Sequence, residues 1–254
     1  MIRIGTFNLN NLFDRFNFHA AVTESPRVRA TYRWRLDASR DLLPPPEDGP
    51  LADEEGAALI EGEAPVRIEL SPQGRVVRPK PTRHLEALLT RTDRLNADVL
   101  AVQEVENIAA LREFNLLLDA PYQFVALIEG NDPRFIDVGV LSRLPIGSAI
   151  SHRWVPDPTD PNRFLFSRDV MAVKILNHAR TAEMFTLWVG HLKSKFVDPQ
   201  ITDPGEIAAA KQRNDGRRTR QAQAMHDIIE AHHSATDAFV VCGDFNDHPD
   251  SAML

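Results

Sequence analysis

The sequence predicts an α/β fold, because short apolar segments with the composition of buried strands alternate with segments of helical periodicity. A hydrophobic fraction of 43% over 254 residues is enough to bury a large core, in one sizeable domain or two small ones. The strand-like segments are residues 99–102, 137–142, 184–189 and 239–242, and the helical ones include residues 83–96, 108–118 and 222–232.

Charge and cysteine content exclude several classes of protein. The formal net charge is -7 and the isoelectric point is near 5.7, so no overall positive field draws the chain to nucleic acid or anionic lipid. The single cysteine, Cys242, excludes an intramolecular disulfide framework and a cysteine-built zinc site. No apolar run approaches the ~20 residues of a membrane span. We expect a cytoplasmic protein by default, or a secreted one if a signal peptide has been removed.

The chain begins with a strand pattern at residues 2–6, followed by a turn-rich segment that contains Asn8. We expect one domain over residues 1–254, interrupted by a proline-rich insertion at about residues 20–82. Within this insertion, residues 66–70 and 75–78 flank a turn and predict a β-hairpin. Residues 32–35 alternate aromatic and basic side chains, which suits nucleic-acid bases and phosphates or, alternatively, an edge that pins the insertion to the domain.

Polar side chains follow several of the predicted strands. Glu104 comes after the strand at 99–102 and could serve a ligand site or cap the next helix. His191, Lys193 and Lys195 follow the strand at 184–189, where they form an anion site or a solvated loop. The basic segment 211–220 opens a predicted helix, either to meet a phosphate or as an exposed face.

The densest polar segment is residues 239–249. Phe239, Val240, Val241 and Cys242 predict a buried strand that ends at Gly243. Oxygen-bearing side chains then follow within four positions, at Asp244, Asn246 and Asp247. The segment is equally typical of an ordinary turn, because glycine, asparagine and aspartate are turn residues.

Five residues share a place at or just beyond a predicted strand end, namely Asn8, Glu104, His191, Asp244 and Asn246. Carboxylate and amide oxygens suit a hard cation, which completes its shell with water and phosphate oxygens. We therefore expect Mg²⁺ as cofactor, with Mn²⁺ or Ca²⁺ as alternatives, and His191 as a hydrogen-bond donor to a phosphoryl oxygen.

The order of these motifs resembles the endonuclease/exonuclease/phosphatase (DNase I-like) superfamily, and its bacterial nuclease-like branch in particular. The similar segments occur in the family's order, and they are residues 6–14, 98–107, 136–143, 190–195 and 243–247. The resemblance implies a four-layer αββα sandwich of two mixed sheets, classed as α/β or by some schemes as α+β, with the active site at one end of the sheets.

The resemblance also implies roles for individual residues. Asn8 and Glu104 would hold the metal. Asp244 would orient or deprotonate the attacking water, Asn246 would position the phosphate or that water, and His191 would contact the phosphoryl oxygens. Arg134, Asp137 and Lys193 would lie near the substrate. The reaction would be metal-assisted hydrolysis of a phosphate ester.

The chain departs from the family at its C-terminal end, where it stops at Leu254 before the family's terminal Ser-Asp-His type motif. The resemblance therefore implies a truncated chain that lacks the last strand or strands and has reduced activity. The substrate expected first is DNA. A phosphatase or phosphodiesterase acting on an inositol phosphate, a sphingomyelin-type lipid or another small phosphoester is the alternative, and a catalytically impaired binding domain is a second one.

Overall fold

The computed structural model describes residues 2–13, 19–22, 68–71, 82–248 and 250–251. The chain divides into two compact units, Met1–Asp14 with Pro79–Leu254, and Arg15–Arg78. The first unit contains the sheets, the helices and the cleft described below. The prediction of a single family domain that carries an insertion stays a prediction.

The first sheet has the strand order β1-β4-β6-β5. Strands β1 and β4 run parallel, whereas β6 is antiparallel to both of its neighbours, β4 and β5. The sheet is therefore mixed, as predicted. Its strands are β1 (Ile4–Leu12), β4 (Val99–Val105), β5 (Phe124–Leu127) and β6 (Asp137–Ser142).

The second sheet has the order β12-β11-β10-β7 and is also mixed. Strands β11 and β12 are parallel, and β10 is antiparallel to β11 and β7. Its strands are β7 (Ile146–Ser151), β10 (Val170–Leu176), β11 (Glu183–His191) and β12 (Phe239–Asp244).

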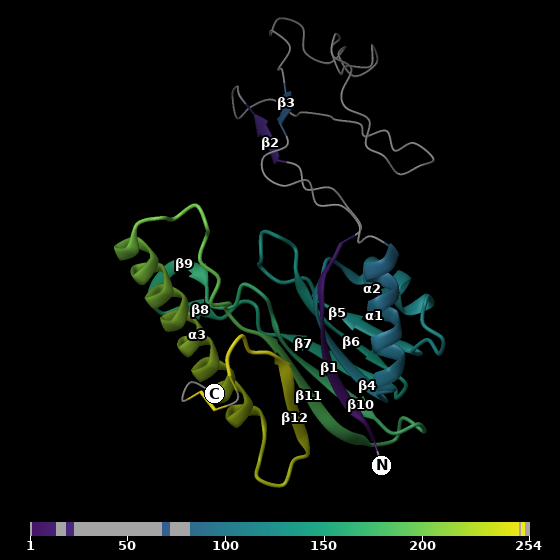
Figure 1. Cartoon of the computed structure of the whole chain (residues 1–254). Helices are drawn as coiled ribbons and strands as arrows, with labels where there is room; N and C mark the ends of the chain where they lie inside the picture. The colour runs from purple at the N-terminus through teal and green to yellow at the C-terminus, as the bar shows by residue number, and fades with distance from the viewer. Residues whose placement is uncertain (1, 14–18, 23–67, 72–81, 249, 252–254) are drawn as a thin grey trace, which may run out of the picture. The chain divides into compact units, whose positions relative to one another are not determined.

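The two sheets pack face to face through one apolar cluster, and helices cover their outer faces. Helices α1 (Thr82–Leu95) and α2 (Ile108–Leu116) pack on the first sheet, and α3 (Pro204–His232) packs on the second (Figure 1). This is the predicted four-layer αββα sandwich. The cluster between the sheets includes Val99, Ala101, Val138 and Val140 from one and Met171, Val173, Leu187 and Val189 from the other.

The helix starts follow local sequence signals. Asn107 caps α2, because its side chain accepts a hydrogen bond from the backbone of Ala110 at 2.9 Å. Asp203 caps α3 in the same way, and Pro204 occupies the first turn. The basic segment 211–220 therefore lies inside α3 rather than at its start, so the predicted conflict with the helix dipole does not arise. None of the described helices is long and apolar enough to cross a membrane.

Short strands were harder to predict. The segment 156–163, which carries no strand pattern, contains β8 (Pro156–Asp157) and most of β9 (Asp160–Phe164), which form a small hairpin. In the second unit, β3 (Ile68–Ser71) pairs antiparallel with β2 (His19–Val22). Residues 75–78, predicted to form a hairpin with residues 66–70, lie outside the described residues. The aromatic and basic residues 32–35 lie outside the described residues.

Candidate active site

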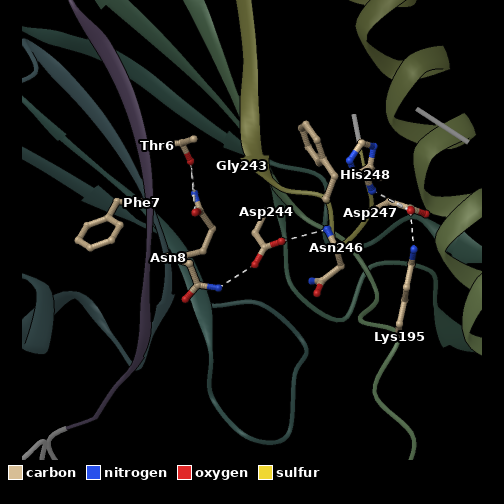
Figure 2. Close-up of a pocket in the computed structure, with 11 residues that line it drawn as sticks. Thr6, Phe7, Asn8, Lys195, Gly243, Asp244, Asn246, Asp247 and His248 are labelled. Atoms are coloured by element: carbon tan, nitrogen blue, oxygen red, sulfur yellow. Dashed lines mark hydrogen bonds and ion pairs between the residues drawn. The ribbon is translucent and has the colours of Figure 1, made fainter. Parts of the chain in front are cut away.

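A cleft of about 710 Å³ opens where β1, β4 and β12 end, between residues of both sheets. Its polar side chains converge from four segments that are distant in the sequence (Figure 2). The cleft is lined by Thr6, Phe7, Asn8, Gln103, Lys195, Gly243, Asp244, Phe245, Asn246, Asp247 and His248. Three residues predicted for the site, Asn8, Asp244 and Asn246, are therefore in one cavity.

A direct hydrogen bond joins the two sheets inside the cleft. The side-chain amide of Asn8 donates to Oδ2 of Asp244 at 2.8 Å, across 236 positions of sequence (Figure 2). The other oxygen of Asp244 accepts from the backbone N–H of Asn246 at 2.9 Å, and the Asn246 amide donates to the Leu192 carbonyl at 3.0 Å. The carboxylate is thereby fixed on both oxygens while its side chain stays 30% exposed.

The backbone is irregular at or next to two of the predicted residues, Asn8 and Glu104, and this sets the direction of their side chains. The regular register between β1 and β4 breaks after the Asn8–Gln103 pair, and Asn10 and Asn11 adopt positive φ. Glu104 also has positive φ, at 60°, where the register between β4 and β6 shifts. Such bulges redirect side chains at the ends of sheets. Asn8 thus lies within β1, not beyond its end as predicted.

His191 lies at the end of β11 with only 2% of its side chain exposed. Its Nε2 is 3.9 Å from Oδ2 of Asp244, and its Nδ1 is buried without a hydrogen-bond partner among the described residues. Burial lowers the pKa of His191, and the positive charge of Arg168 acts in the same direction. The imidazole is therefore neutral at neutral pH, with one N–H to donate.

Arginines flank the site on the loop before β6 and the segment before β10. Arg134 makes a bidentate pair with Asp132, with both N–O distances at 3.0 Å, and its side chain is 59% exposed. Arg168 is 2% exposed and reaches Asp132 at 3.3 Å and the Leu192 carbonyl. Burial raises the pKa of Asp132, but hydrogen bonds from Arg134 and the two guanidinium charges hold it below its ordinary value.

Lys193 and Glu104 belong to the same charged neighbourhood. Burial lowers the pKa of Lys193, as do the charges of Arg168 and Arg134. The negative charge of Glu104 raises the pKa of Arg134 after the larger effects of Asp132 and burial. No hydrogen bond or ion pair to Glu104 is present within the described ranges, so its carboxylate is available for a ligand.

Asp137 is one of the predicted residues that lie outside the cleft lining, together with Glu104, His191, Arg134 and Lys193. It is 2% exposed at the start of β6 and accepts a hydrogen bond from the backbone of Gly130 at 2.7 Å. Burial raises its pKa to about 7, and the nearby charges of Glu129, Asp132 and Asp169 contribute in the same direction. Asp137 does not line the cleft. A structural role in shaping the Gly130 loop follows directly from this hydrogen bond.

Helix α3 anchors the loop after β12. Arg218 is 1% exposed and donates to Oδ2 of Asp247 at 3.1 Å and to Asp215 at 2.5 Å. Lys195 contacts the other oxygen of Asp247 at 2.5 Å (Figure 2). Gln221 accepts from the backbone N–H of Lys193 at 2.7 Å. The basic residue Arg218 therefore serves neither a phosphate nor an exposed face, the two interpretations considered from the sequence.

Of the two residues predicted to hold a cation, Asn8 lines the cleft and Glu104 does not. Across the described part of the chain, no three histidine, cysteine or acidic side chains cluster as a complete metal cage. Asn8 and Glu104 offer one amide and one carboxylate oxygen, since Asn8 pairs in register with Gln103, the residue before Glu104. Mg²⁺ is commonly held by one or two carboxylates together with substrate phosphates and waters.

A family model for the Endonuclease/Exonuclease/phosphatase family matches residues 68–254. The chain belongs to this family, which confirms the resemblance seen in the motifs. Asn8 lies before the matched residues, and its hydrogen bond to Asp244 brings it into the cleft. A comparison with curated proteins found no significant match.

Several solved structures are similar in part. A β-hairpin deletion mutant of beta toxin from Staphylococcus aureus is 14% identical, with a TM-score of 0.45, and covers 67% of this chain and 61% of its own. The catalytic domain of human Nocturnin is 15% identical, with a TM-score of 0.42, and the corresponding shares are 69% and 61%. ANGEL2, described as a 2',3'-cyclic phosphatase, is 18% identical at a TM-score of 0.40, with shares of 67% and 45%. The chain therefore spans less than two thirds of each of these structures.

Sequence reasoning missed the burial of three charged residues, Asp132, Arg168 and Arg218. It also missed the ion pair between Lys195 and Asp247. A signal existed for Arg168, because a charged pair directly precedes an apolar strand at Arg168 and Asp169. These two residues lie directly before β10, which begins at Val170.

Proposed function

We propose that this chain hydrolyses phosphodiester bonds with the help of a divalent cation, and that its substrate is DNA. The observation that carries the proposal is the Asn8–Asp244 hydrogen bond at 2.8 Å. It brings an amide from one sheet and a carboxylate from the other into one open cleft. Membership of the Endonuclease/Exonuclease/phosphatase family supports the coarser statement, hydrolysis of phosphate esters.

Each polar side chain has a role that suits its contacts. Asp244 is a fixed carboxylate with partial exposure, so it is positioned to accept a proton from an attacking water or to orient that water. Asn246 holds Asp244 through its backbone N–H and the Leu192 carbonyl through its side chain. His191, as a neutral imidazole, donates one hydrogen bond toward a phosphoryl oxygen.

Asn8 and Glu104 would hold the cation, with Mg²⁺ as the expected ion. Bound there, it would offset the negative charge that develops on the phosphoryl oxygens during hydrolysis. Cationic side chains of the protein would also offset this charge. Arg134 and Lys193 lie within reach of each other's charge and are suited to phosphate contacts.

Cationic side chains near the site are the basis for proposing nucleic acid despite the net charge of -7. Arg134 pairs with Asp132 and is 59% exposed, and the charges of Arg168 and Arg134 lower the pKa of Lys193. Arg168 is 2% exposed, so Arg134 and Lys193 are the side chains suited to contact a DNA phosphate, and such contacts supply much of the affinity for DNA.

The test combines metal binding with turnover. We expect Mg²⁺ to bind by titration calorimetry and to support nicking of plasmid DNA, with activity lost in the presence of a chelator. Asn8→Ala and Glu104→Ala should each weaken Mg²⁺ binding at least ~10-fold, the usual range for loss of a ligand or its close support. Glu113→Ala, an exposed acid on α2, is the matched control. Undiminished Mg²⁺ affinity in both site variants would refute the ligand assignment.

A small phosphoester is the second candidate substrate, favoured by the acidic body of the protein. Such a molecule needs only one or two phosphate contacts. Parallel assays on plasmid DNA, an inositol phosphate and sphingomyelin, each with Mg²⁺ and with chelator, separate the two. Turnover of only the small substrates would show that DNA is not the substrate. Nicking that survives the chelator would eliminate the metal-assisted reaction.

A further inference from the structure

Two aromatic rings are exposed together beside the β8–β9 hairpin. Trp154 is 57% exposed and Phe164 is 40% exposed, and their ring centroids are 5.0 Å apart at an angle of 76°. The guanidinium of Arg153 lies 4.3 Å above the Trp154 ring. By contrast, Trp188 is 1% exposed in the core. An exposed tryptophan with a cation on one face and an aromatic ring beside it is a surface suited to a flat ligand.

The aromatic pair is held by firm backbone contacts. Arg217 donates to the carbonyls of Phe164 and Leu165, both at 3.0 Å, and Gln221 donates to the same Leu165 carbonyl at 2.8 Å. The backbone of Leu165 donates to Val155 at 2.8 Å. Helix α3 therefore fixes both sides of the hairpin, and the rings project from a rigid base rather than from a loose loop.

The same segment is tied to the candidate active site. Asn131 donates to the carbonyl of Arg153 at 2.7 Å, and the next residue, Asp132, holds Arg134 and Arg168 beside His191. In Figure 1 the hairpin lies next to the N-terminal half of α3, at the end of the sandwich toward which β1 runs. The segment that carries Trp154 is thus hydrogen-bonded to the loop that holds Arg134.

Arginines lie beside the two rings. Arg153 is above the Trp154 ring, and Arg217 donates to the carbonyl of Phe164 at 3.0 Å. Arg163 directly precedes Phe164, and its side chain is 51% exposed and lies 3.9 Å from Asp160. Positive charge is therefore present on both segments that carry the rings.

We propose that Trp154 and Phe164 form a stacking platform for an unpaired base of single-stranded nucleic acid, whose phosphates contact Arg153 and Arg163 beside the rings. The proposal rests on the proposed function and specifies the form of its substrate. An aromatic ring stacks on any base whose face is free, and arginines pair with the phosphates on either side. Bases inside a duplex already have both faces stacked, so a duplex would use this platform less.

Binding without turnover tests the platform directly. Fluorescently labelled oligothymidylate is titrated in the presence of a chelator, and the anisotropy gives Kd for the full chain and for Trp154→Ala and Phe164→Ala. We expect Kd to rise about 5- to 100-fold in each variant, the range for the loss of one base–ring stack. Leu116→Ala, which removes a 74% exposed side chain from α2, should leave Kd unchanged.

Two further ligands separate stacking from charge. An abasic oligomer keeps the phosphates without the bases, so the full chain should bind it more weakly, and Trp154→Ala should not weaken it further. Arg163→Ala, at a side chain 51% exposed, should weaken both oligomers alike and reduce the salt dependence of log Kd by about one phosphate contact. A matching duplex should lose less affinity than oligothymidylate in Trp154→Ala.

The outcomes distinguish a failure of this inference from a failure of the proposed function. If the full chain cleaves no phosphodiester but binds oligothymidylate through Trp154, the proposed reaction fails and the platform stands. If it cleaves single strands while Trp154→Ala, folded by circular dichroism, keeps the original Kd, the platform is refuted. Trp154-dependent retention on phosphatidylserine vesicles without base-dependent binding of oligothymidylate would also refute it, since the rings would then serve a lipid surface.

Discussion

The ion pair between Asp132 and Arg168 offers the sharpest test of how the site is held. The two side chains are 4% and 2% exposed, and their closest N–O distance is 3.3 Å. In Asp132→Asn the shape is retained while the carboxylate is lost, so Arg168 keeps only the Leu192 carbonyl and the Ser167 hydroxyl as partners. We expect a loss of stability together with a loss of activity.

The magnitude follows from burial. Breaking a buried ion pair by removing one partner costs about 3–5 kcal/mol, and the two remaining hydrogen bonds of Arg168 favour the lower end, about 3 kcal/mol. For a chain of this size such a loss lowers Tm by about 6–12 °C. The exposed pair Arg163–Asp160, at 3.9 Å, is the matched control, because Asp160→Asn there should cost less than about 1 kcal/mol.

The pH dependence has a definite sign. The folded-state pKa of Asp132 is held below its ordinary value of 3.8, so the stabilisation is present above that value and disappears as pH falls through the folded pKa. The difference in unfolding free energy between the original chain and Asp132→Asn should therefore be full at pH 7 and narrow toward pH 3. Urea unfolding at several pH values measures it.

A double variant completes this test. In Asp132→Asn with Arg168→Met no buried charge is left unpaired, so the pair of changes should destabilise less than the sum of the two single changes. Simple additivity, or a single-variant loss below about 1 kcal/mol at pH 7, would refute the reasoning from buried charge.

Two other substitutions probe Asp137 and the backbone at Gly243. Because burial raises the pKa of Asp137 to about 7, the folded chain favours the neutral acid, and the carboxylate costs up to about 4 kcal/mol as pH rises from about 4 to above 7. Asp137→Asn should therefore raise Tm at pH 8 and change it little at pH 5; a lower Tm at pH 8 would contradict the assignment. Gly243 has φ of 148°, and a Cβ there would lie 1.9 Å from the Gly190 carbonyl oxygen. Gly243→Ala should destabilise by at least about 1–3 kcal/mol and displace Asp244, measured by thermal unfolding and by turnover; unchanged values for both would show that β12 does not need this close approach.

Much of the fold was predictable because its signals are local. The strands β4, β6 and β11 are short apolar runs, and α1 and α2 show helical periodicity close to their observed bounds. Buried parallel and mixed strands give such runs because both faces of the sheet are covered. The family motifs then defined how these elements join, which periodicity alone does not specify.

The parts that were not predicted depend on partners far along the chain. The pairing of β2 with β3 spans an interval that carries no local signal, so the sequence does not predict it. Buried charges are equally hidden, since Arg218 looks from its sequence context like any other arginine in a basic segment. Its burial follows only once α3 packs on the second sheet and Asp247 lies opposite it.

The backbone irregularities near Asn8 and Glu104 explain why these two residues lie within strands and not beyond the strand ends as predicted. The sequence indicates turn formers after Asn8, whereas the structure continues β1 through to Leu12 with left-handed residues at Asn10 and Asn11. Positive φ at Glu104 has no residue-type signal, because glutamate is not a residue that favours it. That these two residues hold a cation stays a prediction. The irregular backbone lies at or next to both of them.

Three layers of the sandwich meet at the loop that begins with Asp244. The first sheet reaches the loop through Asn8, the second supplies β12, and α3 holds Asp247 through Arg218. The position of the Asp244 carboxylate therefore depends on how the two sheets pack. A change in the apolar cluster between them, such as at Val189, would alter the Asn8–Asp244 distance without touching either residue. Hydrogen bonds weaken steeply with distance and angle, so a small displacement of one sheet against the other would weaken the bond between the Asn8 amide and the Asp244 carboxylate. The packing of the core therefore helps to set the geometry of the candidate site.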